Sequence, residues 1–124
     1  MPLPTCPVTL DGRTGPVIVQ DLDDDDLPGF YRAADWLLCT SRWEGFGLAI
    51  AEALACGTPA LLPASLDVAP ELLADGGGIV YQDSTHLAHI LATHPRLTGR
   101  LPAEFDWDAN AEATLTLYQD LTTE

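Results

Sequence analysis

The sequence contains no lysine, and this absence defines its charge. All basic residues are arginines, five in number, and they face 19 acidic residues, so the formal net charge is -14. A surface of this sign repels phosphate backbones, which excludes nucleic acids and anionic membranes as general partners. Two explanations of the acidity stay open: adaptation to high salt, where ions screen the repulsion between carboxylates, or an ordinary acidic protein fragment.

Long apolar runs are also missing. No stretch approaches the roughly 18 apolar residues that span a bilayer, and the opening MPLPTCPVTL lacks the order of basic and apolar regions found in signal peptides. The three cysteines are odd in number and unevenly spaced, so they predict no disulfide framework. Cys39 and Cys56 stand in apolar surroundings and are predicted to be reduced core thiols. We therefore expect a cytoplasmic protein without a transmembrane segment.

The chain length permits one domain with a modest core. A hydrophobic content of 47% in 124 residues is typical of a folded protein, and no internal repeat interrupts the chain. Short apolar runs alternate with helix-like stretches, which favours βαβ units and a parallel sheet. Strands are predicted at 16–20, 36–40, 59–63 and 76–82, the last including its turn. Helices are predicted at 24–34, 48–56, 69–74, 84–94 and from 108 onward.

The predicted fold class is therefore α/β, with a Rossmann-like parallel sheet of about four strands and flanking helices. Gly57 would end one helix, and Asp83 or Ser84 would begin another. Periodicity and strand position predict a core, which would consist of Tyr31, Trp36, Leu37, Leu54, Leu61, Leu62, Ile79, Val80 and Trp107.

The stretch SRWEGFGLAIAE, residues 41–52, carries the candidate chemistry. It begins after a predicted strand and leads into a helix, and the N-terminus of a helix attracts anions through unpaired N–H groups. Gly45 and Gly47 allow close approach of a ligand to the backbone. Glu44 and Glu52 could accept hydrogen bonds from paired hydroxyl groups, as sugars present them. Anion donors beside acids suggest a ligand in which sugars flank phosphate, as in a nucleotide sugar.

A longer segment containing this stretch resembles a known family. Residues 31–72, YRAADWLLCTSRWEGFGLAIAEALACGTPALLPASLDVAPEL, are similar to the C-terminal, donor-binding domain of retaining GT-B glycosyltransferases of family 4, or group 1. The likeness rests on two glutamates separated by seven residues, on Gly57 and Pro59 after them, and on the helix with Glu71. It extends over roughly residues 17–118, including the FDW that precedes the last helix.

The resemblance implies roles for individual residues. Glu44 would be catalytic, contacting the hydroxyls of the donor sugar near the reacting centre. Glu52 would hold the ribose hydroxyls. The remaining donor-binding residues would be Thr40, Ser41, Gly45, Phe46, Gly47, Leu48 and Glu71. Glu71 also has a simpler explanation, as an acid favoured by the helix dipole. The resemblance implies no obligatory metal and no cofactor.

The sequence departs from the family in two respects. The basic residues that neutralise the diphosphate lie upstream of the region covered, and no lysine is present. The 124 residues also cannot hold an acceptor domain, so residues 1–124 are predicted to be a single partial donor-binding domain. Strand 36–40 would lack a neighbour, and open strand edges recruit other chains. We therefore expect a complementary glycosyltransferase half or self-association, with a non-catalytic interaction or nucleotide-sugar-binding module as the alternative.

Three other patterns in the sequence resemble a phosphatase loop, a calcium loop and a metal-binding histidine pair, but each lacks a required residue. VIVQDLD resembles the nucleophile loop of haloacid dehalogenase-like phosphatases, but Asp24 and Asp25 stand where such loops carry Gly-Thr. The same acids do not form a calcium loop, because the required glycine and closing glutamate are absent. His86 and His89 have helical spacing for a metal pair, yet no third ligand is evident. We expect a solvated acidic segment at the entry to a helix, and exposed or half-buried helix histidines that bind no metal.

Overall fold

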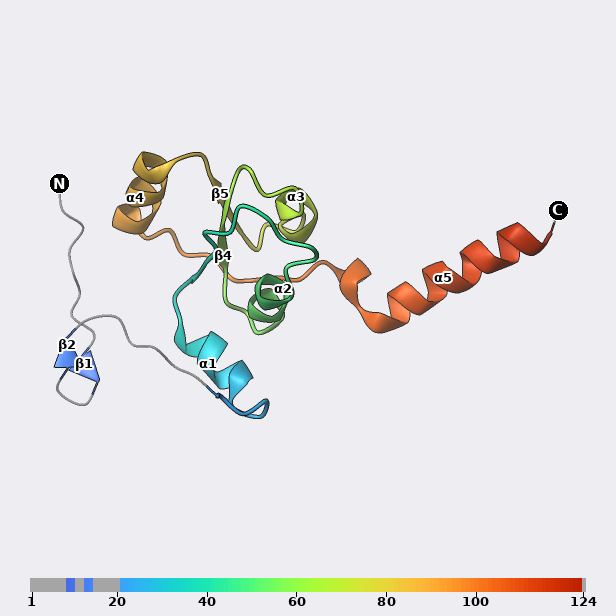
Figure 1. Cartoon of the computed structure of the whole chain (residues 1–124), viewed down its shortest axis with the longest axis horizontal. Helices are drawn as coiled ribbons and strands as arrows, with labels where there is room; N and C mark the ends of the chain where they lie inside the picture. Colours follow the sequence, from blue (N-terminus) through green and yellow to red (C-terminus); the bar gives the residue numbers. More distant parts are fainter. Residues whose placement is uncertain (1–8, 11–12, 15–20, 124) are drawn as a thin grey trace.

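The structure is a computed structural model that describes residues 9–10, 13–14 and 21–123 (Figure 1). The predicted strand at 16–20 and Cys6 lie outside the described residues. Two short strands, β1 (Thr9–Leu10) and β2 (Arg13–Thr14), form an antiparallel pair that the sequence did not predict. No helix in the described ranges is long and apolar enough to cross a bilayer.

The centre of the fold is a three-stranded parallel sheet in the order β3-β4-β5. Its strands are β3 (Leu37–Leu38), β4 (Ala60–Pro63) and β5 (Gly78–Tyr81). Helices flank this sheet (Figure 1). The α/β, Rossmann-like class is thus confirmed for a partial domain, with three parallel strands among the described residues.

Helix α1 (Leu27–Ala33) begins later than predicted. The expected start at Asp24 is wrong because Pro28, inside the first turn, has no N–H to donate to a carbonyl one turn earlier. The acids before it instead form a turn, in which the N–H groups of Asp26 and Leu27 donate to the carbonyl of Asp23 at 3.0 and 3.1 Å. This exposed turn confirms the solvated acidic segment expected from the sequence.

Helix α2 (Leu48–Ala55) ends as the sequence predicted. Gly57 follows the last turn in the left-handed region, with φ of 88°. Its N–H donates to the carbonyl of Leu54 at 3.0 Å, and that of Thr58 donates to Ala53 at 2.9 Å. These two bonds form a Schellman motif, which satisfies carbonyls at the helix end and turns the chain into β4.

The remaining helices are α3 (Ala69–Leu72), α4 (Ser84–Thr93), the 3-10 helix η1 (Ala103–Phe105) and α5 (Trp107–Thr122). Of these, α3, α4 and α5 follow the sequence predictions closely, whereas η1 was not predicted. Asp83 is the cap of α4, because its side chain accepts a hydrogen bond from the His86 N–H at 2.8 Å. The His86 ring also bonds to the backbone before the helix, since its Nδ1 accepts from the Gln82 N–H at 3.1 Å. The arrangement resembles a capping box, except that the ring bonds to the residue before the N-cap instead of to the N-cap itself.

The core lies between α2, α3 and the sheet. Leu54, Leu61 and Leu62 are fully buried, as predicted, together with Leu72. The other predicted core residues are less enclosed: Tyr31, Trp36, Leu37, Ile79 and Val80 are half-buried, and of these Leu37 and Val80 pack against the buried cluster.

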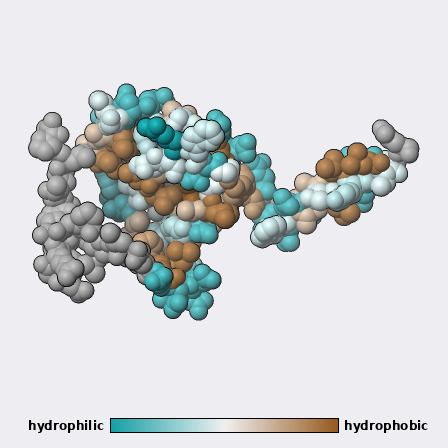
Figure 2. All heavy atoms as spheres, in the orientation of Figure 1, coloured by the Kyte–Doolittle hydropathy of each residue, from teal (hydrophilic) through white to brown (hydrophobic). Residues whose placement is uncertain are grey.

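The prediction that Trp107 belongs to the core is wrong, because it is 85% exposed. It begins α5, which extends away from the body and contains no buried residue (Figure 1). Figure 2 shows hydrophobic residues on this projecting helix as well as over the body. The large exposed apolar residues of α5 are Trp107, Leu115, Leu117, Tyr118 and Leu121.

Candidate functional site

The sheet topology brings the predicted donor-binding segments to one edge. The segment leading to α2 follows the carboxyl end of β3, and the segment leading to α3 follows the carboxyl end of β4. These strands are adjacent and parallel. In open α/β sheets, ligands bind outside the carboxyl ends of the strands. The geometry therefore places residues 40–48 and Glu71 on the edge where such folds carry their sites.

Gly47 determines how the chain passes from this loop into α2. It is the N-cap residue and adopts the left-handed region, with φ of 82° and ψ of 53°. A Cβ here would lie 3.1 Å from Cδ1 of Ile50 and 3.4 Å from Cδ1 of Leu72. Both the backbone conformation and the close packing favour glycine. In the described chain the first N–H groups of α2 donate no hydrogen bond to a cap side chain, so they are available to an anion.

The residues before α2 are mostly solvent-accessible. Ser41 is half-buried and Gly47 is buried. The other predicted members of this loop are exposed, namely Thr40, Glu44, Gly45, Phe46 and Leu48. Glu71 is exposed in the first turn of α3, next to Leu72, whose side chain lies beside Gly47. The structure thus brings α3 against the start of α2.

Glu52 lies in the second turn of α2 and has a defined partner. The Tyr31 hydroxyl donates a hydrogen bond to Oε2 of Glu52 at 2.8 Å. The pKa of Tyr31 is raised to about 12. Burial is the largest cause, and the hydrogen bond to Glu52 and the charge of its carboxylate add to it. Tyr31 therefore remains a protonated donor at neutral pH. Sequence reasoning placed Tyr31 only in the core and missed this contact.

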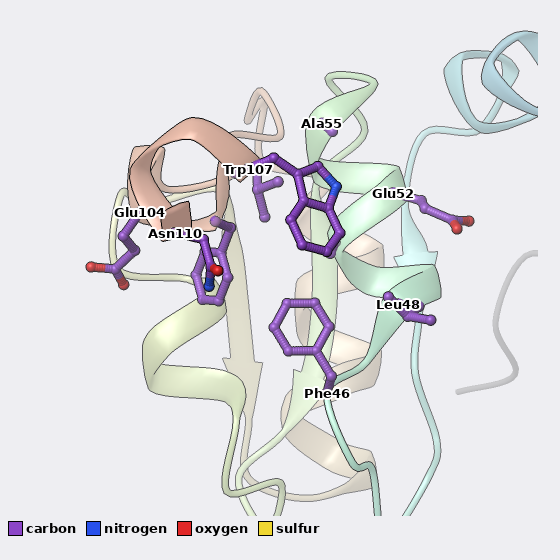
Figure 3. Close-up of a pocket in the computed structure, with 10 residues that line it drawn as sticks. Phe46, Leu48, Glu52, Ala55, Glu104, Trp107 and Asn110 are labelled. Atoms are coloured by element: carbon purple, nitrogen blue, oxygen red, sulfur yellow. The ribbon is translucent and has the colours of Figure 1, made fainter. Parts of the chain in front are cut away.

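A cavity of about 570 Å³ lies beside the exposed face of α2 (Figure 3). Of the predicted site residues it includes Phe46, Leu48 and Glu52, whereas Glu44 and the others do not line it. Figure 3 shows the Glu52 carboxylate directed away from the rings of Phe46 and Trp107. The lining residues are Phe46, Leu48, Ala51, Glu52, Ala55, Leu101, Glu104, Phe105, Trp107 and Asn110.

Sequence reasoning missed the part of this cavity that comes from η1 and the start of α5. A local signal existed on α2 alone, because Leu48, Ala51, Glu52 and Ala55 have the spacing of one helix face. Nothing local showed that η1 would close the other side. The lining of this cavity is predominantly apolar and includes a few polar groups. Such a lining is typical of small-molecule pockets.

Within residues 21–123, the alternative motifs form no metal-binding arrangement. Among the described residues, no three side chains of His, Cys, Asp or Glu gather as ligands of one ion. His86 uses its Nδ1 in the cap of α4. The acids at 21 and 23–26 are exposed around a turn.

Comparisons with known proteins identify the family. Residues 17–93, more than half of the chain, match the family described as Glycosyl transferases group 1. The chain belongs to this family, as the resemblance in the sequence predicted. No solved structure gives a significant match.

Curated relatives agree with the family. The chain is 35% identical over 116 residues to a D-inositol 3-phosphate glycosyltransferase of Corynebacterium jeikeium, covering 78% of this chain and 26% of the relative. It is 39% identical over 70 residues to O-antigen chain mannosyltransferase B of Escherichia coli, covering 55% and 18%. A mannosylfructose-phosphate synthase of Agrobacterium fabrum is 51% identical over 39 residues, covering 32% and 9%. The chain thus spans about a quarter, or less, of the relatives it matches.

Proposed function

We propose that this chain binds a nucleotide-diphosphate sugar at the start of α2, as the donor-binding part of a retaining glycosyltransferase. The observation that carries the proposal is the left-handed Gly47, which opens α2 between Glu44 on the loop and Glu52 on the helix. Family membership supports the same assignment.

Each predicted residue has a role in this proposal. Glu44 is the catalytic residue and contacts the donor sugar near the reacting centre. The amides of residues 45–48 donate to the diphosphate or the sugar, because helix N-termini stabilise anions. Glu52 accepts hydrogen bonds from the ribose. Thr40, Ser41 and Glu71 complete the donor pocket. Stabilisation of the leaving diphosphate, which carries developing negative charge, is the electrostatic part of the catalysis.

Transfer to an acceptor requires a partner in this proposal, either a complementary glycosyltransferase half or a second copy. The absence of lysine supports this requirement, because the resemblance implies an arginine and a lysine that neutralise the diphosphate. Among the described residues, β3 pairs with a strand on one side only, and open edges favour pairing. We place the protein in the cytoplasm, where Cys39 and Cys56 would stay reduced, as they are in the structure.

Calorimetric titration with UDP-, GDP- and ADP-linked hexoses tests donor binding. One of them should bind to the full chain, and Glu52→Ala should weaken that binding. Glu112→Ala is a matched control, because it removes an exposed acid from α5. The absence of heat with every donor, in folded protein at low and high salt and with the candidate partner half present, would refute the proposal.

Size-exclusion chromatography with light scattering tests the partner. A dimer, or a complex with a lysine-containing glycosyltransferase half encoded nearby, should appear as concentration rises. A protein that stays monomeric at all concentrations and forms no complex with such a half would contradict the proposed pairing. Donor binding with no transfer in the assembled complex would instead support a non-catalytic binding module.

A further inference from the structure

Tyr31 connects the two helices on which the candidate ribose site depends. Its hydroxyl donates to Oε2 of Glu52 at 2.8 Å, which joins α1 to α2. The two residues are 21 positions apart in the chain, so the contact depends on the packing of one helix on the other. Glu52 itself is exposed, while Tyr31 is half-buried.

The backbone of Tyr31 is held at a second point. The hydroxyl of Thr58 donates to the Tyr31 carbonyl at 2.6 Å. Thr58 is only 2% exposed and is the last residue of the Schellman turn that ends α2. The ring of Phe30 also meets that of Tyr31 edge to face, with centroids 6.4 Å apart. Tyr31 is therefore anchored to the end of α2 by its backbone and to the middle of α2 by its hydroxyl.

This arrangement limits the freedom of an exposed carboxylate. A glutamate side chain ordinarily samples several rotamers in solvent, and ordering it on binding costs entropy. A hydrogen bond to Oε2 restricts that sampling before a ligand arrives. It also leaves Oε1 and the remaining lone pairs to accept hydroxyl hydrogens. The Tyr31 hydroxyl is protonated, and therefore a donor, at neutral pH, since its pKa lies above even the ordinary value of 10.0.

We propose that Tyr31 is a positioning residue, whose hydroxyl holds the Glu52 carboxylate in the orientation that receives the paired hydroxyls of the donor ribose. This inference rests on the proposed donor site and deepens it. Tyr31 acts through Glu52 and contributes to affinity by organising the carboxylate in advance. It is distinct from the catalytic role assigned to Glu44.

A double-mutant cycle in the full chain tests this inference. Tyr31→Phe should weaken binding of the preferred nucleotide hexose by about 10-fold, the range of a hydrogen bond to a charged group. Glu52→Gln should also weaken binding. The double variant should bind no more weakly than Glu52→Gln alone, because the hydroxyl acts only through the carboxylate. Tyr118→Phe is the matched control, since it removes a hydroxyl from exposed α5.

The matching 2′,3′-dideoxy nucleotide hexose separates positioning from a general defect. Tyr31→Phe and wild type should bind this ligand with equal affinity, because the ligand lacks the two ribose hydroxyls that would donate to Glu52. An equal loss with both ligands, or strictly additive effects in the cycle, would overturn the inference. Normal binding of the ribose ligand by Tyr31→Phe would overturn it and leave the donor site intact. Failure of the wild type to bind any donor would refute the donor site itself.

Discussion

The rings of Phe46 and Phe105 meet edge to face, with centroids 5.4 Å apart and an interplanar angle of 63°. The contact joins the loop before α2 to η1, which directly precedes α5. It closes one side of the cavity beside α2. The position of the loop therefore depends partly on a segment near the C-terminus.

Truncation of either ring should reveal this coupling. Phe46→Ala and Phe105→Ala should each lower the free energy of unfolding, and the cycle with the double variant should show a coupling of about 0.5–1.5 kcal/mol, typical of aromatic pairs. Urea denaturation followed by circular dichroism measures it. A coupling energy indistinguishable from zero would show that the two rings contribute independently.

Gly47→Ala should destabilise the fold. An alanine would be held in the left-handed region, which costs about 1–2 kcal/mol for a residue with a Cβ, and its methyl would lie 3.1 Å from Ile50 Cδ1. Donor binding should weaken too, because α2 would have to begin differently. Gly29→Ala in α1 is the control, since nothing lies within 4 Å of a Cβ there. Equal unfolding midpoints for the two variants would contradict this account.

Leu54→Ala tests where the core lies. Leu54 is 1% exposed, and removing such a side chain costs about 2–5 kcal/mol through lost transfer energy and the remaining cavity. Leu115→Ala on α5 should change the free energy of unfolding by less than about 0.5 kcal/mol in the monomer, since Leu115 is 58% exposed. Thermal unfolding at low protein concentration compares the two. A large loss from Leu115→Ala would mean that α5 is packed in solution.

The tyrosine contact predicts a dependence of stability on alkaline pH. The folded pKa of Tyr31, about 12, lies above its ordinary value of 10.0. Its contribution to stability should therefore be fully present below pH 10, and it should be lost as pH rises toward 12. Glu52→Gln should lower the pKa of Tyr31, because it removes the carboxylate charge.

Absorbance of the phenolate during alkaline titration measures this pKa. Comparison of the wild type with Tyr31→Phe identifies the signal of Tyr31 among the three tyrosines. The titration needs no ligand, so it tests the contact separately from donor binding. An unchanged Tyr31 titration in Glu52→Gln would argue against the hydrogen bond.

Several features of the site were predictable because their causes are local. The second glycine of GFG, Gly47, and the glycine after Cys56, Gly57, mark the two ends of α2, since left-handed backbone positions favour a residue without a Cβ. The cap at Asp83 was predictable because its cause is also local: the Asp83 side chain accepts a hydrogen bond from the N–H only three residues away. Pro28 could have corrected the start of α1, as its missing N–H acts within one helical turn.

The sequence by itself thus determined the alternation of strands and helices, the limits of α2 and the family. Tertiary structure alone decided that Tyr31 meets Glu52, that Phe46 meets Phe105, and that Trp107 stays exposed. The physical reason is the range of the interactions. Capping and backbone preferences act between residues a few positions apart, whereas burial and side-chain pairing depend on which elements pack together in the folded chain.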